Sequence, residues 1–200
     1  MPRPKEYQQE HVLDRATECF WQHGYTATSM KHLEQATGLT PGSLYNSFGS
    51  KDGLFLACLD HYNDTVIGER VRHYLKPAIR EYQEAPLQGI ENFIATAFEP
   101  GPAELCLGCL MVNTSVELGP HEETVRQRTT EAMRKVLQGI QYSLNGAQAK
   151  GQLSSTVDYR QRAQSLSLMF NGMLVQWRGA TDKRWLKNAM TSVRELLMSN

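Results

Sequence analysis

Two cysteines separated by two residues, Cys106 and Cys109, have the spacing that zinc sites and redox motifs use. A structural zinc site would need a second such pair, and Cys19 and Cys58 are not spaced as one. A thioredoxin-like motif needs a strand–helix–strand context, which the sequence pattern does not indicate. We therefore predict neither a metal ion nor a cofactor. Two interpretations stay open: both cysteines are small buried hydrophobic side chains, or Cys109 is a sensing thiol with a lowered pKa and solvent access.

A second candidate site is the run of small residues from Thr40 to Ser43. Thr40 can cap a helix whose first residue is Pro41, where the missing N–H costs nothing. Small residues at an exposed helix start let the backbone approach DNA closely, and their hydroxyls can bond to phosphates or base edges. The set of predicted DNA-contacting residues is completed by side chains that can reach phosphates and by a helix N-terminus: Thr28, Ser29, Thr40, Pro41, Gly42, Ser43, Tyr45, Asn46 and Lys51.

The elements that must position these residues form a helix-turn-helix pattern between residues 28 and 48. Thr28 and Ser29 offer an N-cap for a short helix that ends at Gly38. A three-residue turn leads into the second helix, which buries Leu44 and Phe48 and ends at Gly49. In this geometry the first helix braces the DNA backbone while the second lies in the major groove.

Helical periodicity dominates the whole chain, and no segment alternates like a strand. We expect a first helix over 7–23 and, after the helix-turn-helix, further helices near 51–76, 87–99, 105–118, 121–149, 157–178 and 182–198. The predicted fold is all-α, with a helix-turn-helix DNA-binding unit over 1–50 and a larger helical bundle over 51–200; the family resemblance described below implies ligand binding and dimerisation for this bundle. Apolar stripes on the last two helices suit a four-helix interface between two subunits.

Several residues of the bundle are candidates for effector binding or redox sensing. Phe170 and Trp177 lie on one late helical stripe, which suits a core or dimer interface and also an adaptable pocket. With Cys106, Cys109 and Asn113 they form the predicted site for an unidentified small-molecule effector.

Composition excludes several classes of protein. The 200 residues carry 21 basic and 21 acidic side chains, so the net charge is zero and nonspecific coating of nucleic acid is not expected. The longest run of apolar or glycine residues, 105–112, is far too short to span a bilayer, and no signal peptide is visible. We therefore predict a cytoplasmic protein without membrane contact. Residues 1–60 have a net charge of −2, so DNA binding would rest on few placed contacts and depend weakly on salt.

The segment ATGLTPGSLYNSFGSKDGLFLACL, residues 36–59, resembles the DNA-binding signature of TetR-family transcriptional regulators. This resemblance implies an all-α homodimer that binds a palindromic operator in double-stranded DNA, with a divergent ligand-binding body. Residues 108–125, GCLMVNTSVELGPHEETV, are similar to a NemR-like subgroup, some members of which sense electrophiles or oxidants through a cysteine at the position of Cys109. One departure is Gly53, where the family often has an acidic residue; we expect Gly53 to fray the helix start beside Lys51.

The sequence thus predicts a transcriptional repressor that responds to a ligand or an electrophile, and not an enzyme. No glycine-rich phosphate loop, catalytic triad order or metal-spaced histidine cluster is present. The alternatives are a thiol-reactive small-molecule-binding protein and a helical protein-interaction module without specific DNA binding.

Overall fold

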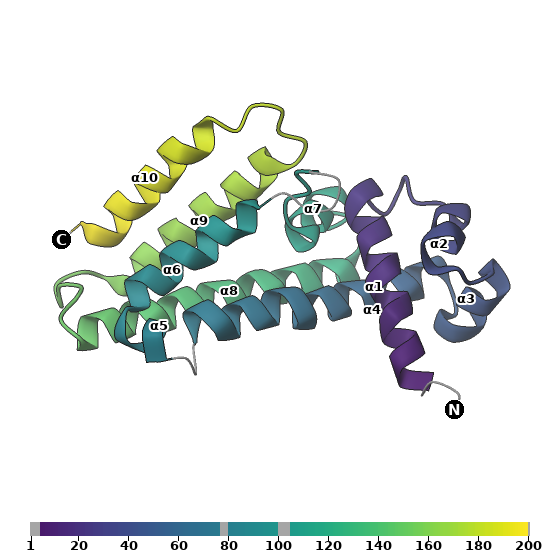
Figure 1. Ribbon diagram of the computed structural model, residues 1–200, viewed down its shortest axis with the longest axis horizontal. Coiled ribbons are helices and arrows are strands. Elements are labelled where there is room, and N and C mark those ends of the chain that lie inside the picture. Colours follow the sequence, from purple (N-terminus) through teal and green to yellow (C-terminus); the bar gives the residue numbers. More distant parts are fainter. Residues whose placement is uncertain (1–4, 77–79, 100–104, 200) are drawn as a thin grey trace.

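A computed structural model describes residues 5–76, 80–99 and 105–199 (Figure 1). Every regular element among the described residues is a helix, which confirms the predicted all-α class. Three helices form a head at one end of the elongated molecule: α1 (Lys5–His23), α2 (Met30–Thr37) and α3 (Pro41–Phe48) (Figure 1). The remaining helices form a body that extends away from the head.

The head packs around a small aromatic and aliphatic core. Phe20 of α1 lies edge-on to Phe55 of α4 (Lys51–Tyr62), with ring centroids 4.8 Å apart. Leu33 of α2 and Leu44 of α3 are fully buried against this core. The turn after α2 contains Gly38 in the left-handed conformation, at φ +71°. Each short helix therefore has one anchoring side and is held in a fixed orientation.

The helix start at Lys51 corrects one expectation. Ser50 caps α4 by accepting a hydrogen bond from the Gly53 N–H at 2.9 Å, so the first turn is closed rather than frayed. A Cβ at Gly53 would lie 2.1 Å from the Phe48 carbonyl oxygen. The glycine therefore permits the close approach of the preceding helix end.

A continuous helical rod runs from the head into the body. α4 continues through two π-helical segments, Asn63–Gly68 and Val71–Leu75, so the rod covers the range predicted for this helix. π-Helical turns inside long helices are frequent at functional sites. The head contacts this rod mainly through α1, and the body contacts it through α6 and α8. The division of the chain between residues 50 and 51 stays a prediction.

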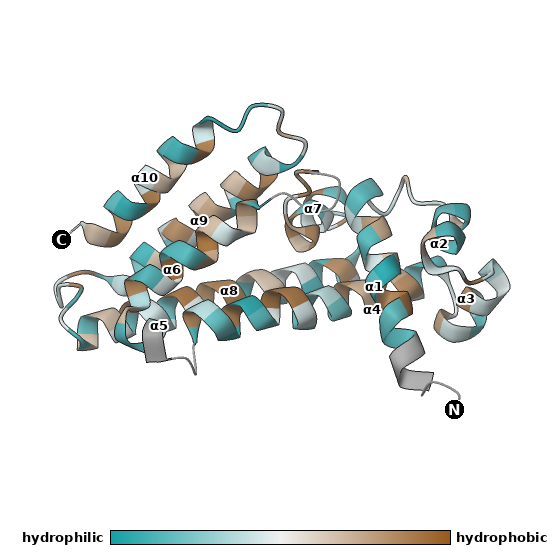
Figure 2. Cartoon of the chain, viewed as in Figure 1, coloured by the Kyte–Doolittle hydropathy of each residue, from teal (hydrophilic) through white to brown (hydrophobic). Residues whose placement is uncertain are grey.

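The body is a layered bundle of the remaining helices. Its elements are α5 (Arg80–Glu84), α6 (Pro86–Ala95) with a following 3-10 turn (Thr96–Phe98), α7 (Leu110–Glu117), α8 (Glu123–Ala149), α9 (Tyr159–Trp177) and α10 (Trp185–Met198). Figure 2 shows hydrophobic residues along α4, α6, α8 and α9, where the core lies. Within the described ranges no helix is long and apolar enough to cross a bilayer.

The helix predicted over 105–118 is wrong in its first part. Residues 105–109 are not helical, and α7 begins only at Leu110. Gly108 has φ +68°, and a Cβ there would lie 2.8 Å from the Leu174 carbonyl oxygen of α9. The segment is extended because it packs closely against α9, which apolar periodicity does not reveal.

Candidate nucleic-acid interface and effector cavity

The start of α2 is capped by side chains that the sequence singled out. The Ser29 Oγ accepts from the His32 N–H at 3.2 Å, and the Ser29 N–H donates to the His32 Nδ1 at 3.3 Å. Thr28 is only 2% exposed, and its hydroxyl donates to the Gly24 carbonyl. The Thr28 side chain therefore braces the loop between α1 and α2, while Ser29 is exposed.

The start of α3 presents the predicted small residues at the surface. Thr40 caps the helix, with its Oγ1 accepting from the Ser43 N–H at 3.3 Å and lying 3.0 Å from the Ser43 Oγ. Gly42 has open space around the position of a Cβ, and Ser43 is exposed. The two larger side chains of the predicted set, Tyr45 and Asn46, are also exposed. The small exposed residues Gly42 and Ser43 therefore leave room for close contact between the start of α3 and a DNA groove. Pro41 is half-buried beside them.

Lys51 is held beside the loop between α1 and α2. Its Nζ donates to the Tyr25 carbonyl at 2.7 Å and lies 4.2 Å from the centroid of the Tyr25 ring. The Tyr25 hydroxyl donates to Asp52, and burial together with that carboxylate raises the pKa of Tyr25 to about 12. An ammonium group has three donors, so the Lys51 Nζ keeps capacity for a phosphate.

Two polar side chains from the body bind the end of α1 and the following loop. The carboxylate of Glu117, at the end of α7, accepts from the Thr26 N–H at 2.8 Å and from the Tyr25 N–H at 3.2 Å. The Arg178 guanidinium donates to the Trp21 carbonyl at 3.1 Å and to the Leu107 carbonyl at 3.2 Å. We call Glu117 and Arg178 with these partners the head–body seam.

The Glu117 carboxylate is stabilised in its charged form. Partial burial alone would raise its pKa, but hydrogen bonds from Thr26 and Tyr25 and the positive charge of Arg178 outweigh this and lower the pKa. Sequence reasoning missed the seam, because the head and body residues that it joins are 91 to 157 positions apart in the chain.

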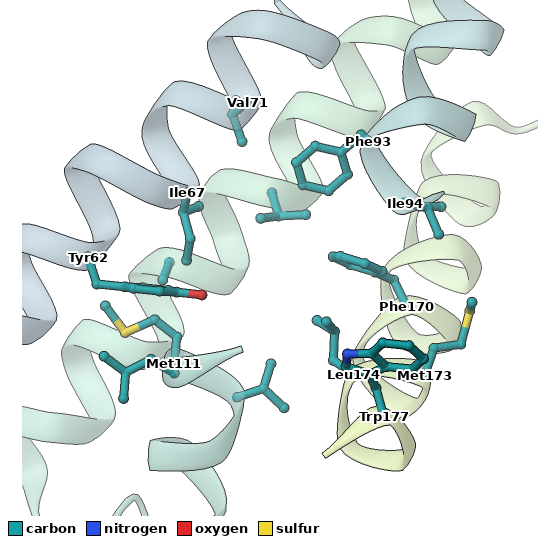
Figure 3. Close-up of a cluster of buried hydrophobic side chains, with 14 of the residues drawn as sticks. Tyr62, Ile67, Val71, Phe93, Ile94, Met111, Phe170, Met173, Leu174 and Trp177 are labelled. Atoms are coloured by element: carbon teal, nitrogen blue, oxygen red, sulfur yellow. The ribbon is translucent and has the colours of Figure 1, made fainter. Parts of the chain in front are cut away.

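A cavity of about 160 Å³ lies in the body against the head. Figure 3 shows Tyr62 of α4, Ile67 of its π-helical continuation and two α9 side chains, Phe170 and Trp177, projecting toward one another. The residues lining this effector cavity are Trp21, Tyr62, Val66, Ile67, Arg70, Phe93, Thr96, Ala97, Glu99, Leu107, Gly108, Cys109, Met111, Val112, Ala132, Met133, Val136, Phe170, Asn171, Leu174 and Trp177. One of them, Trp21, belongs to the head.

Three of the predicted effector residues line this cavity and two do not. Cys109, Phe170 and Trp177 form part of the wall. Asn113 donates to the Leu107 carbonyl at 2.9 Å, which fixes the extended segment. Cys106 is buried, and its carbonyl accepts from the Gly179 N–H at 2.8 Å.

The environment of Cys109 does not favour a thiolate. Burial raises the pKa of the Cys109 thiol, and hydrogen bonds from the Val112 N–H and the Tyr62 hydroxyl offset this only in part. A sensing thiol needs a lowered pKa. Across the described ranges, no group of three or more potential ligands could hold a metal ion.

Comparison with known proteins identifies the family of both parts of the chain. The family model described as "Bacterial regulatory proteins, tetR family" matches residues 12–58, and the model "Tetracyclin repressor-like, C-terminal domain" matches residues 86–193. The HTH-type transcriptional repressor ComR of Escherichia coli K12 is 32% identical over 198 residues, covering 96% of this chain and 90% of ComR.

Solved structures show the same fold over nearly the whole length. Reduced NemR of E. coli has a TM-score of 0.80 at 22% identity, covering 94% of this chain and 96% of NemR. A cysteine mutant of CifR bound to 26-bp operator DNA has a TM-score of 0.77 at 23% identity, covering 98% of each chain. With the capped helix-turn-helix, these matches establish that the chain belongs to the TetR family of DNA-binding transcriptional regulators.

Proposed function

We propose that this chain is a cytoplasmic, homodimeric repressor whose operator binding is released by a small-molecule effector. The observation that carries this proposal is the exposed start of α3, where Gly42 and Ser43 lie on an otherwise well-anchored helix. Relatives named as repressors and a structural neighbour bound to operator DNA support it. Each subunit would insert α3 into one half-site, with two half-sites about 34–36 Å or a multiple of that apart.

Dimerisation through α9 and α10 is supported by their exposed apolar side chains. Leu168 and Val175, seven residues apart on one side of α9, are 62% and 50% exposed, and Met198 at the end of α10 is 72% exposed. Gly172, between them on α9, leaves open space around its Cβ position. Large exposed apolar side chains grouped in this way mark interaction surfaces, and a two-fold axis would bury the same patch on both subunits.

Effector release would act through the rod that starts with α4. The rod begins at Lys51 in the head and lines the cavity through Tyr62 and Ile67. A ligand that fits one position of the rod better than another would change the spacing of the two α3 helices. The cavity is apolar over most of its wall, as small-molecule sites usually are.

The test is fluorescence anisotropy of the full-length protein on the DNA that flanks its own gene, with excess random competitor. We expect competitor-resistant binding that is weakened in Ser43→Ala and unchanged in Ser155→Ala, since Ser155 is exposed in the loop between α8 and α9. Selection from a random DNA pool is the second arm. A protein that enriches no palindromic sequence there would contradict the proposal and favour a protein-interaction or thiol-reactive role.

A response of Cys109 to electrophiles stays a prediction. It is tested in the same assay by adding N-ethylmaleimide to the wild type and to Cys109→Ser. Loss of operator binding in the wild type alone would support thiol gating, and identical behaviour of both proteins would leave reversible binding in the cavity as the regulatory event.

A further inference from the structure

Arg70 is a half-buried cation at the wall of the effector cavity. It lies between the two π-helical segments of the rod. Its guanidinium donates to the Phe93 carbonyl and lies 5.1 Å from the centroid of the Phe93 ring and 5.7 Å from that of Tyr74. Burial lowers the pKa of Arg70, because the charged form loses solvation. The protein thus surrounds this charge with a carbonyl and two aromatic faces.

No carboxylate neutralises Arg70 within the part of the chain that the structure describes. Glu99 also lines the cavity and attracts the guanidinium, but it is exposed and forms no recorded ion pair with it. A buried charge is normally paired, because desolvation without a counter-charge is costly. An anion that enters the cavity would supply that counter-charge.

Trp21 also lines the cavity, and its indole carries a second unused donor. Its indole Nε1 is buried and has no hydrogen-bond partner among the described residues. The ring is held edge-on against Tyr62, with centroids 5.3 Å apart. Buried donors without acceptors are rare and point to a missing partner. Arg70 thus keeps N–H groups beyond the one that the Phe93 carbonyl accepts, and the Trp21 N–H has no acceptor.

The rest of the cavity wall favours a ligand that is apolar and flat apart from its charged group. Phe93, Phe170 and Trp177 contribute aromatic faces, and Met111 and Met133 contribute adaptable thioethers. A cavity of about 150 Å³ is known to hold benzene. The effector cavity, at about 160 Å³, thus has room for one ring with a small substituent.

The geometry points to a small organic monoanion as the effector: a single-ring aromatic carboxylate whose carboxylate pairs with Arg70 and accepts from the Trp21 indole. This inference rests on the proposed function, because it names the ligand class of the same cavity. It also assigns the coupling step. Trp21 belongs to α1 of the head and Arg70 to the body, so a carboxylate that contacts both would join the two parts directly. The Trp21 carbonyl is at the same time an acceptor in the head–body seam.

The first test is isothermal titration calorimetry of the 200-residue protein with benzoate and cinnamate and with their uncharged counterparts benzamide and cinnamyl alcohol. We expect the carboxylates to bind at least about tenfold more tightly than the neutral molecules, the size of one charge-assisted hydrogen bond. Equal or weaker binding of the carboxylates, or no carboxylate binding below about 1 mM, would overturn the inference.

Variants of Arg70 and Trp21 test whether these residues bind the carboxylate. Arg70→Gln should weaken carboxylate binding by roughly ten- to hundredfold and leave binding of the neutral molecules unchanged. Trp21→Phe keeps the ring and removes the donor, so a loss of roughly threefold to tenfold is expected. Arg72→Gln is the matched control, since Arg72 lies on the same rod with an exposed side chain. An Arg70→Gln protein that melts like the wild type and keeps full carboxylate affinity would refute the assignment.

A measurement of operator binding without ligand tests the proposed function independently of the ligand class. Wild type and the control Arg72→Gln should bind the operator equally well in the anisotropy assay. A protein that binds its operator but prefers neutral molecules contradicts only the ligand class. A protein that binds no operator contradicts the proposed function, whereas carboxylate selectivity in calorimetry would still support the assignment of Arg70 and Trp21.

Discussion

Replacing Glu117 by Gln should loosen the head from the body. The carboxylate accepts two backbone N–H groups, from Tyr25 and Thr26, and the amide that replaces it keeps only one acceptor oxygen. Hydrogen bonds to a charged group contribute about 1.5–3 kcal/mol each. Because Glu117 is partly exposed, we take the lower end and expect a loss of about 2 kcal/mol. For a chain of this length that lowers Tm by roughly 4–8 °C.

The assay is thermal unfolding followed by circular dichroism at one fixed protein concentration, because the Tm of a protein that self-associates depends on concentration. Glu195→Gln, at an exposed position of α10, is the control and should melt like the wild type. Operator affinity should fall in Glu117→Gln as well, because the loop that carries Thr26 precedes the recognition helices. A variant that melts within 1 °C of the control would refute the assigned role of the seam.

The stability difference between wild type and Glu117→Gln should depend on pH. The pKa of Glu117 in the unfolded chain is about 4.3, and its pKa in the folded protein is lower. Its contribution to stability is therefore complete above that unfolded value and is lost as the pH falls through the lowered folded value. The difference in Tm between wild type and Glu117→Gln should shrink from pH 7 toward pH 3. A difference that is constant over this range would show that the charge plays no part.

Three further outcomes follow from the same geometry. Gly24→Ala should destabilise the protein more than Gly179→Ala, because both glycines have positive φ but a Cβ at Gly24 would lie 2.9 Å from the Glu117 carboxylate; equal melting temperatures would contradict this. Lys51→Ala should weaken binding to operator and random DNA alike and reduce the salt slope by about one, as for a phosphate contact; loss of binding to operator alone would indicate base contact. Cys109 should react with N-ethylmaleimide more slowly than free cysteine at pH 7, because burial raises its pKa. Mass spectrometry of samples taken over time measures the reaction rate, and a rate above that of free cysteine would contradict this prediction.

Local signals predicted the head well. Each boundary there depends on residues close in sequence: Thr40 caps the helix that begins at Pro41, and Gly38 ends the helix before it. Capping and left-handed glycines act within one turn, so the sequence alone defines them. The continuous rod from Lys51 was also predicted, because its apolar residues keep a helical period across the π-helical segments.

Long-range contacts explain what sequence reasoning did not predict. The extended segment before Leu110 depends on close packing of Gly108 against the Leu174 carbonyl, and its apolar residues were interpreted as helix. The unpaired state of Arg70 and the orphan donor of Trp21 are visible only when α1 and the rod are placed around one cavity. Neither residue stands out by spacing, because the two are 49 positions apart in the chain.

A cavity whose wall includes both head and body imposes a quantitative condition on regulation. A ligand can shift the equilibrium between two conformations only by its difference in affinity for them, and the coupling is reciprocal. If a bound carboxylate lowers operator affinity tenfold, the operator must lower carboxylate affinity tenfold. Calorimetry measures the ratio of carboxylate affinities without and with operator DNA. Anisotropy measures the ratio of operator affinities without and with carboxylate. Arg70→Gln should bring both ratios toward one together, because it removes the contact between ligand and rod. A variant that loses carboxylate binding yet still releases the operator at the same carboxylate concentration would place the regulatory site outside this cavity.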